Sequence, residues 1–251
     1  MTFQPDCGIK ADVIPSPNFG DRKSDKVDMI LLHYTATETA HIAQQWLCNP
    51  DSNVSAHYLI NEAGVITQMV SERHRAWHAG LSLWEGISDT NSRSIGIEIQ
   101  HCGDQDTPFP KKQINSLIHL LADILKRHQI APHRVLAHSD VAPGRKQDPG
   151  RSFPWDALAY AGIGHYVPPH PILAGPFLQQ GDEGQAVEAL QALLGLYGYG
   201  IDIKGQYDQI TYDVVTAFQR HFRQEKVDGI ADRSTLETLN ALLQARKKFL
   251  A

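Results

Sequence analysis

A proline-rich segment divides this chain into two parts. Residues 166–176 read Tyr-Val-Pro-Pro-His-Pro-Ile-Leu-Ala-Gly-Pro, with four prolines and one glycine in eleven positions. Proline fixes its backbone and lacks an amide hydrogen, so this composition interrupts both helices and strands. We predict a linker at residues 166–176 between a first domain, residues 1–165, and a second, residues 177–251. A length of 251 residues accommodates two unequal domains.

The first part shows the pattern of an α/β domain, with a central sheet flanked by helices. Short aliphatic and β-branched runs alternate with longer polar or helical stretches. The predicted strands are residues 27–34, 55–60, 65–70, 94–100 and 134–138. The clearest helix is expected over residues 111–128, where apolar residues recur at helical spacing and Pro110 can occupy the first turn. This helix should cover one face of the sheet.

The second part is predicted to be a small all-α domain. Apolar residues recur at helical spacing within residues 187–194, 214–222 and 236–243. An internal repeat accompanies these helices, because the pattern Gly-x-x-Asp-x-x-Thr at residues 205–211 returns at residues 229–235. In each copy a turn glycine precedes Asp or Thr side chains that can cap the next helix.

Composition excludes several classes of protein. Hydrophobic residues at 42% and charged residues at 20% are typical of a soluble globular chain. A net charge of −5 argues against nucleic acid as a partner. The three cysteines, Cys7, Cys48 and Cys102, form no CxxC pair, so neither a disulfide framework nor a thiolate zinc site is indicated. The first 26 residues carry many charges and no long apolar run, so we expect neither a signal peptide nor a membrane span in this chain.

Histidine is unevenly distributed and points to chemistry in the first part. Twelve of the 13 histidines lie at or before His170. His33 and His138 end two predicted strands, and Asp148 follows ten residues after His138 in a loop rich in proline and glycine. Two strand ends can meet at one edge of a sheet, which suggests a His2Asp zinc site with an open position for water. On spacing alone, hydrogen-bonded structural histidines are the alternative.

Glu98 is the second unusual residue. It lies in the alternating strand Ser94–Ile99, on the face opposite Ile95, Ile97 and Ile99. One interpretation is a general base that accepts a proton from a metal-activated water molecule. The other is a glutamate on the solvated face of a half-exposed sheet.

Several segments of the first part together resemble a known enzyme family. They are Leu32-His33-Tyr34-Thr35, residues 54–59 (Val-Ser-Ala-His-Tyr-Leu), residues 76–80 (Ala-Trp-His-Ala-Gly), residues 91–98 (Asn-Ser-Arg-Ser-Ile-Gly-Ile-Glu), Ala137-His138-Ser139-Asp140 and Lys146-Gln147-Asp148-Pro149-Gly150. In this order they are similar to the zinc N-acetylmuramoyl-L-alanine amidases of the AmpD/AmiD type, over about residues 10–165. The fold that this resemblance implies is the one these amidases share with the peptidoglycan-recognition proteins.

The resemblance also implies roles for individual residues. His33, His138 and Asp148 would bind one zinc ion per chain, Glu98 would be the catalytic base, and Lys146 would lie near the developing oxyanion. Substrate contacts are expected from six further residues in or beside the motifs, Tyr34, His57, Trp77, His78, Asn91 and Arg93. For each of these six, ordinary packing, turn formation or surface charge is the alternative. Trp84 is a further aromatic residue that could line a sugar-binding cleft or simply pack in the core.

The second part resembles the three-helix peptidoglycan-binding domain over about residues 177–245. The matching positions run from Leu178, Gly181 and Asp182 to Asp232 and Thr235. This resemblance implies a domain that anchors the enzyme to the wall and raises the local substrate concentration. The alternative is a unit that only packs against the first domain.

The expected function is hydrolysis of the amide bond between the lactyl group of N-acetylmuramic acid and the L-alanine of the stem peptide. The substrate would be peptidoglycan or an (anhydro)muropeptide, in wall turnover or recycling. Two alternatives remain, a non-catalytic peptidoglycan receptor and a zinc peptidase that cuts within the stem peptide. The sequence leaves open the oligomeric state and the compartment. Lack of a signal favours the cytoplasm, and a wall-binding domain favours the periplasm.

Overall fold

The first part of the chain folds around a six-stranded mixed sheet. A computed structural model describes residues 3–250, so residues 1–2 and 251 of the two predicted domains lie outside it. The strands, in sheet order, are β1 (Asp12–Val13), β5 (Ile66–Gln68), β4 (Tyr58–Ile60), β7 (Ser94–Ile99), β3 (Met29–Tyr34) and β8 (Val135–Ala137). All five predicted strands are confirmed with shorter bounds. The strand β1 and a separate pair, β2 (Phe19–Asp21) with β6 (His74–Ala76), were not predicted.

The centre of the sheet is parallel and buried. Strand β3 pairs in parallel with β7 on one side and β8 on the other, and β4 continues the parallel order beyond β7. Parallel strands are covered on both faces, which explains the almost unbroken aliphatic run Met29–Leu32 at the start of β3. Side chains of adjacent residues point to opposite faces, so Ile30 and Leu32 belong to a different apolar cluster from Met29 and Leu31.

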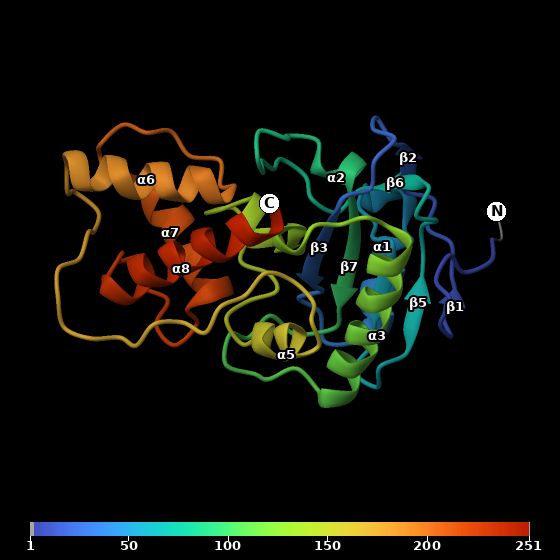
Figure 1. The fold of residues 1–251 in the computed structure, drawn as a ribbon. Helices are drawn as coiled ribbons and strands as arrows, with labels where there is room; N and C mark the ends of the chain where they lie inside the picture. Colours follow the sequence, from blue (N-terminus) through green and yellow to red (C-terminus); the bar gives the residue numbers. More distant parts are fainter. Residues whose placement is uncertain (1–2, 251) are drawn as a thin grey trace.

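Helix α3 (Lys111–Arg127) covers one face of the sheet, as predicted (Figure 1). Its buried residues Ile114, Leu117 and Leu121 pack on the same cluster as Ile30 and Leu32. Pro110 is the residue before the first helical turn and not within it. The short helix α5 (Trp155–Tyr160) extends this layer, and its Trp155 and Leu158 join the same cluster.

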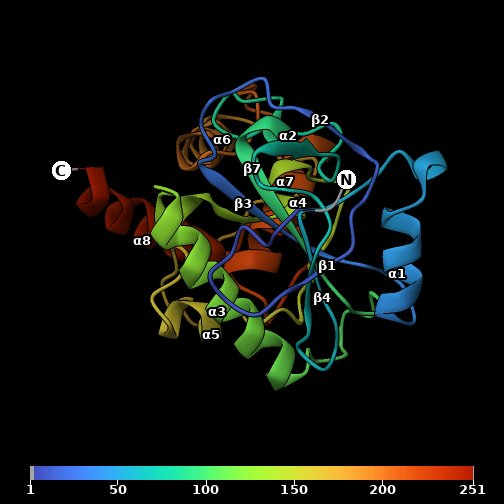
Figure 2. The same cartoon turned by 90° about the vertical axis from the view of Figure 1, so that its right-hand side faces the viewer.

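Two separate units cover the opposite face. Helix α1 (Ala40–Leu47) packs over β4, on the side of the sheet away from α3 (Figure 2). The helical second part covers β3 and β8. Helix α2 (Thr90–Arg93), helix α4 (His138–Val141) and the 3-10 turns Pro50–Ser52 and Pro132–Arg134 complete the first part.

The second part consists of three helices, as predicted. They are α6 (Gln185–Tyr197), α7 (Gln209–Phe222) and α8 (Arg233–Leu250). The internal repeat has the expected capping function. The Asp208 carboxylate accepts the Thr211 amide hydrogen at 2.9 Å, and Asp232 accepts that of Thr235 at 2.8 Å. Both caps satisfy amide groups that the first turn of a helix leaves unpaired.

Residues 166–176 contain neither helix nor strand, and Figure 1 shows the chain between α5 and α6 running around the helical part. The two parts nevertheless share one apolar cluster. Met29, Leu31 and Leu136 from the sheet pack in it with residues of the helical part that include Val214 and Phe218. In the described part of the chain, none of the helices combines the length and apolarity that a membrane span requires.

Candidate metal centre and active site

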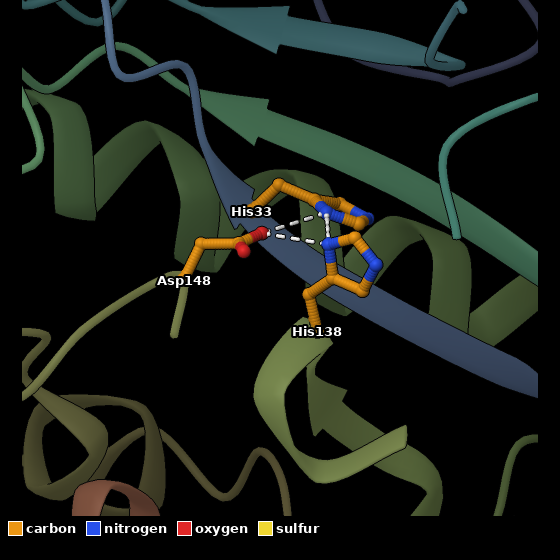
Figure 3. Close-up of side chains that lie close together, drawn as sticks. All are labelled: His33, His138 and Asp148. Carbon is orange, nitrogen blue, oxygen red and sulfur yellow. Dashed lines mark hydrogen bonds and ion pairs between the residues drawn. The ribbon is translucent and has the colours of Figure 1, made fainter. Parts of the chain in front are cut away.

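His33, His138 and Asp148 converge at one edge of the sheet (Figure 3). His33 lies near the end of β3, and His138 is the first residue of α4, directly after β8 rather than at its end as the sequence suggested. Because β3 and β8 are parallel neighbours, both histidines emerge at the same edge. The loop after α4 then brings Asp148 back to them.

Three donor atoms face one another at this point. The Nδ1 atoms of His33 and His138 are 2.9 Å apart, and Asp148 Oδ2 lies 3.0 Å from the first and 2.9 Å from the second. Zinc bonds of about 2.0–2.2 Å at tetrahedral angles separate their donors by about 3.3 Å. The three atoms are thus spaced as ligands around one cation, and all three side chains are buried.

The second nitrogen of each histidine has a partner that orients the ring. His138 Nε2 lies 2.9 Å from the Ala79 carbonyl oxygen, which can only accept, so the proton belongs on Nε2 and the lone pair on Nδ1. His33 Nε2 lies 3.0 Å from His78 Nδ1. His78 Nε2 in turn lies 3.3 Å from the Ser94 hydroxyl. This chain of contacts leaves both Nδ1 atoms free to bind a metal.

The protonation states also suit a metal site. Burial, reinforced by His138, lowers the pKa of His33 to about 4. Burial alone would raise the pKa of Asp148, but His138 and His33 hold it well below its usual range. A neutral imidazole and an ionised carboxylate are the forms that bind metals, so His33 and Asp148 are in the states that a metal ion requires of its ligands.

Glu98 lies beside the metal site on the same face of the sheet. In the parallel ladder between β3 and β7 it is the direct partner of His33. Its Oε2 atom is buried and has no hydrogen-bond partner in the part of the chain that the structure describes. Burial, with a further contribution from Asp148, raises the pKa of Glu98 well above its usual value. The alternative interpretation placed Glu98 on a solvated face of the sheet, whereas in the structure Glu98 lines the pocket described next.

A cavity of about 260 Å³ opens above these residues. Its lining combines the metal site, Glu98 and Lys146 with an apolar and aromatic wall from α1 and its surroundings. The residues that line it are His33, Tyr34, Thr35, Ala36, Thr37, Ala43, Trp46, Leu47, Val54, Ser55, Trp77, His78, Glu98, His138, Lys146 and Asp148. Such a cavity can hold a ligand with polar and apolar groups close to the metal site.

The structure brings three of the six expected substrate contacts to this cavity, namely Tyr34, Trp77 and His78. His57 was expected at the cleft wall, but its ring is fully buried, and its Nδ1 atom accepts the Gly96 amide hydrogen at 3.0 Å. Burial, with a contribution from the Arg22 cation, lowers the pKa of His57 to about 3.

Asn91 and Arg93 also lie away from the cavity. The Asn91 side-chain oxygen accepts the amide hydrogens of His78 and Ala79 at 3.1 and 2.9 Å, so it holds the segment that orients both metal-site histidines. Arg93 forms an ion pair with Asp28.

Some contributors to the site were missed by the sequence interpretation. Trp46 on α1 lines the cavity, and its side chain is 57% exposed. Nothing in the sequence around Trp46 indicated whether its side chain would face a cavity or pack in the core. Gly96 lies opposite the His78 ring, and a Cβ atom there would be 2.4 Å from His78 Cγ. A glycine within a strand often marks such a close approach, and this signal was present in the sequence.

The helical part also contacts α4, the helix that begins with His138. Asp140 follows His138 in α4 and is completely buried. It accepts hydrogen bonds from the Ala137 amide at 2.8 Å and the Tyr199 hydroxyl at 2.7 Å, and its Oδ2 lies 2.7 Å from His221 Nδ1. Trp84, weighed above as a sugar contact, is fully buried against Tyr197 and Tyr199.

Comparisons with known proteins agree with this geometry. A family model for N-acetylmuramoyl-L-alanine amidase matches residues 23–151, and a model for a peptidoglycan binding domain matches residues 183–239. The N-acetylmuramoyl-L-alanine amidase AmiD of Escherichia coli (strain K12) is 36% identical over 234 residues, which are 87% of this chain and 83% of that protein.

Solved structures show the same similarity across both parts. E. coli AmiD, solved with the substrate anhydro-N-acetylmuramic acid-L-Ala-D-γ-Glu-L-Lys, has a TM-score of 0.76 at 35% identity, covering 89% of this chain and 91% of that one. AmpDh3 from Pseudomonas aeruginosa has a TM-score of 0.72 at 30% identity, with all of both chains covered. This chain therefore belongs to the N-acetylmuramoyl-L-alanine amidases of the AmiD/AmpD type, with a C-terminal peptidoglycan-binding domain.

Proposed function

We propose that this amidase binds one zinc ion through His33, His138 and Asp148. Its reaction is hydrolysis of the amide bond between the lactyl group of N-acetylmuramic acid and L-alanine. The observation that carries the proposal is the set of three donor atoms within 3.0 Å of one another, beside a buried and unpaired Glu98 carboxylate oxygen. The substrate class is taken from E. coli AmiD, whose solved complex holds an anhydro-muropeptide.

Each residue has a chemical task in this proposal. Zinc, when bound, supplies a Lewis acid and a water molecule of lowered pKa. Glu98 accepts the proton of the attacking water and delivers it to the leaving amine of L-alanine. Its raised pKa brings it closer to the working pH of a general base. Lys146 lines the same cavity and stabilises the negative charge that develops on the carbonyl oxygen.

The wall of the cavity orients the substrate. Tyr34 and Trp77 offer aromatic faces on which an apolar side of a sugar ring can pack. His78 positions the His33 ring. Asn91 in turn positions His78, because its side-chain oxygen accepts the His78 backbone amide hydrogen. We therefore assign a positioning role to Asn91 and a purely structural role to Arg93 and His57.

The Glu98→Gln variant tests the catalytic assignment. It preserves the volume of the side chain and removes the base, so we expect one zinc per chain and a loss of about 10²-fold or more in amide hydrolysis. Zinc content is measured by elemental analysis, and Glu62→Gln, an exposed glutamate outside the cavity, is the matched control. Undiminished turnover of Glu98→Gln would remove Glu98 from the role of base.

Mass spectrometry of the wild-type products distinguishes the amidase from the alternatives. Release of the free anhydro-sugar with an intact peptide that begins with L-alanine supports the proposal. A shortened peptide would indicate a peptidase. A zinc-loaded protein that binds the muropeptide and releases neither product would indicate a receptor.

We also propose that residues 177–251 bind peptidoglycan and hold the enzyme at its substrate. The match of the family model to residues 183–239 supports this role. The full-length Glu98→Gln protein should sediment with insoluble peptidoglycan, and failure to sediment would contradict the anchoring role.

A further inference from the structure

A second cavity lies where the two parts of the chain meet. It has a volume of about 360 Å³ and is lined from both parts, by Gly144, Arg145, Lys146 and Gln147 of the loop after α4 and by Tyr212, Asp213, Thr216 and Arg220 of α7. Lys146 lines this cavity and the active-site pocket alike. The second cavity therefore adjoins the site of hydrolysis, and the peptidoglycan-binding domain provides half of its wall.

Two cations line this cavity without a direct ion pair. Neither the Lys146 ammonium group nor the Arg220 guanidinium group forms a hydrogen bond or ion pair with another residue in the described part of the chain. The other charged groups of the lining are Arg145 and Asp213. Arg145 donates to the carbonyl oxygens of Ala79 and Leu81, and the Asp213 carboxylate accepts a hydrogen bond from Gln209 at 2.9 Å.

Arg220 is also partly removed from water. Burial lowers the pKa of Arg220, and Tyr34, a residue of the active-site wall, together with Tyr212 and the Asp213 carboxylate, offsets part of that shift electrostatically. Removing a charged group from water without pairing it costs free energy, which an anionic ligand recovers when it binds. A guanidinium group binds a carboxylate through two parallel hydrogen bonds, and an ammonium group beside it adds attraction.

We propose that Arg220 and Lys146 form a subsite for a free carboxylate of the stem peptide. This inference rests on the proposed function, because the peptide must enter from the active-site pocket. The ligand solved with E. coli AmiD carries two such groups, since the γ-linkage of its glutamate leaves the α-carboxylate free and its lysine is C-terminal. Substrate recognition thus includes a side chain from the peptidoglycan-binding domain, and that domain contributes to stem-peptide specificity.

Binding measurements on an inactive enzyme test the subsite independently of catalysis. The proteins are zinc-loaded Glu98→Gln alone, with Arg220→Gln, and with Arg233→Gln. Arg233 is a matched control, because it lies in the same domain, on α8, and pairs with Glu237 away from both cavities. Calorimetry measures the Kd of each protein for anhydro-N-acetylmuramic acid-L-Ala-D-γ-Glu-L-Lys and for two analogues, one with the glutamate α-carboxylate amidated and one with the C-terminal carboxylate amidated.

We expect Arg220→Gln to weaken binding of the unmodified ligand about tenfold, the size of effect typical for one charge-assisted contact. One of the two amidated analogues should bind Glu98→Gln about tenfold more weakly than the parent and should be insensitive to Arg220→Gln. That analogue identifies which carboxylate occupies the subsite. Arg233→Gln should leave all three Kd values unchanged.

Equal Kd values for the proteins with and without Arg220→Gln would overturn the subsite, as would an equal loss of affinity for all three ligands. Circular dichroism verifies that the Arg220→Gln protein is folded, so lost binding cannot come from unfolding. Failure of the proposed function would appear differently, because the wild-type enzyme would then release no peptide that begins with L-alanine.

Discussion

Gly96 shows at the scale of single residues how the metal site depends on a position without a side chain. It lies in β7, two residues before Glu98, and faces the His78 ring that orients His33. We expect Gly96→Ala to displace this ring and to lower zinc affinity and activity about 10- to 100-fold, the usual effect of losing a contact to a metal ligand. Competition with a zinc chelator measures the affinity.

The control for this variant is Gly195→Ala. Gly195 lies in α6, where an added Cβ atom would meet its nearest neighbour at an ordinary 3.8 Å. Its zinc affinity should equal that of the wild type. If Gly96→Ala also bound zinc with wild-type affinity, contact between His78 and His33 would not be needed to orient the ligand.

A buried ion cluster far from the metal site leads to a prediction about pH. Burial alone would raise the pKa of Glu72, but Arg127, His128 and the Tyr58 hydroxyl hold it at about 2. Because this pKa is lower in the folded chain than the usual 4.5, the ionised carboxylate stabilises the fold above about pH 4.5. That contribution is lost as the pH falls toward 2.

The Glu72→Gln variant tests this contribution. At pH 7 it should lower the free energy of unfolding by about 2 kcal/mol, because the amide keeps the shape of the carboxylate and loses its charge. The difference from wild type, measured by urea denaturation, should shrink between about pH 5 and pH 3. A difference that stays constant over this range would show that the charge of Glu72 contributes nothing.

Individual site residues could be predicted from the sequence only where a motif surrounds them. The five residues whose roles the motifs imply all line one pocket, namely His33, His138, Asp148, Glu98 and Lys146. His57 and Asn91 lie in equally distinctive motifs, yet neither lines the cavity. Both accept hydrogen bonds from backbone amides instead, His57 from Gly96 and Asn91 from His78. Spacing along a chain does not reveal whether a polar side chain faces a cavity or pairs with the backbone, because that depends on neighbours far away in sequence.

At the scale of elements, the sequence predicted every strand that lies within a longer apolar run, including the three-residue strands β4, β5 and β8, and missed β1, β2 and β6. The aliphatic runs of β3 and β7 and the amphipathic pattern of α3 are long enough to show their period. Strands β1, β2 and β6 have two or three residues each and show none. The register that pairs His33 with Glu98 is also absent from any local pattern, because it is set by packing on both faces of the sheet.

The contact between α4 and the helical part gives a prediction about stability. The Tyr199 hydroxyl donates to the buried Asp140 carboxylate, which also lies 2.7 Å from His221 on α7. Tyr199→Phe removes this donor without changing the packing of the ring. We expect a loss of about 2 kcal/mol in the free energy of unfolding, the usual cost of a hydrogen bond to a buried charge.

Tyr160→Phe is the control for this measurement, because the Tyr160 side chain is almost fully exposed. It should leave the free energy of unfolding unchanged within about 0.5 kcal/mol. An equally small effect of Tyr199→Phe would mean that His221 and the Ala137 amide satisfy Asp140 without it.

At the scale of the whole molecule, the proline-rich segment predicted a linker between two domains, and the structure shows that both domains contribute to one apolar cluster. Met29, Leu31 and Leu136 cover the sheet face toward the helical part, and Trp84 is buried between the two. The sequence could not reveal this contact, because a buried parallel strand has the same aliphatic pattern whether the helix that covers it belongs to its own domain or to another.

This shared cluster predicts that the two parts unfold together. Separation would expose Met29, Leu31 and Trp84 to water and leave Asp140 without Tyr199 and His221, so an intermediate with only one part folded is unfavourable. Differential scanning calorimetry of the full chain should show one transition whose calorimetric and van't Hoff enthalpies agree. Trp84→Ala, which leaves a cavity in this contact, should lower the transition temperature by several degrees. Two separate transitions in the wild-type chain would instead mean that the two parts unfold independently.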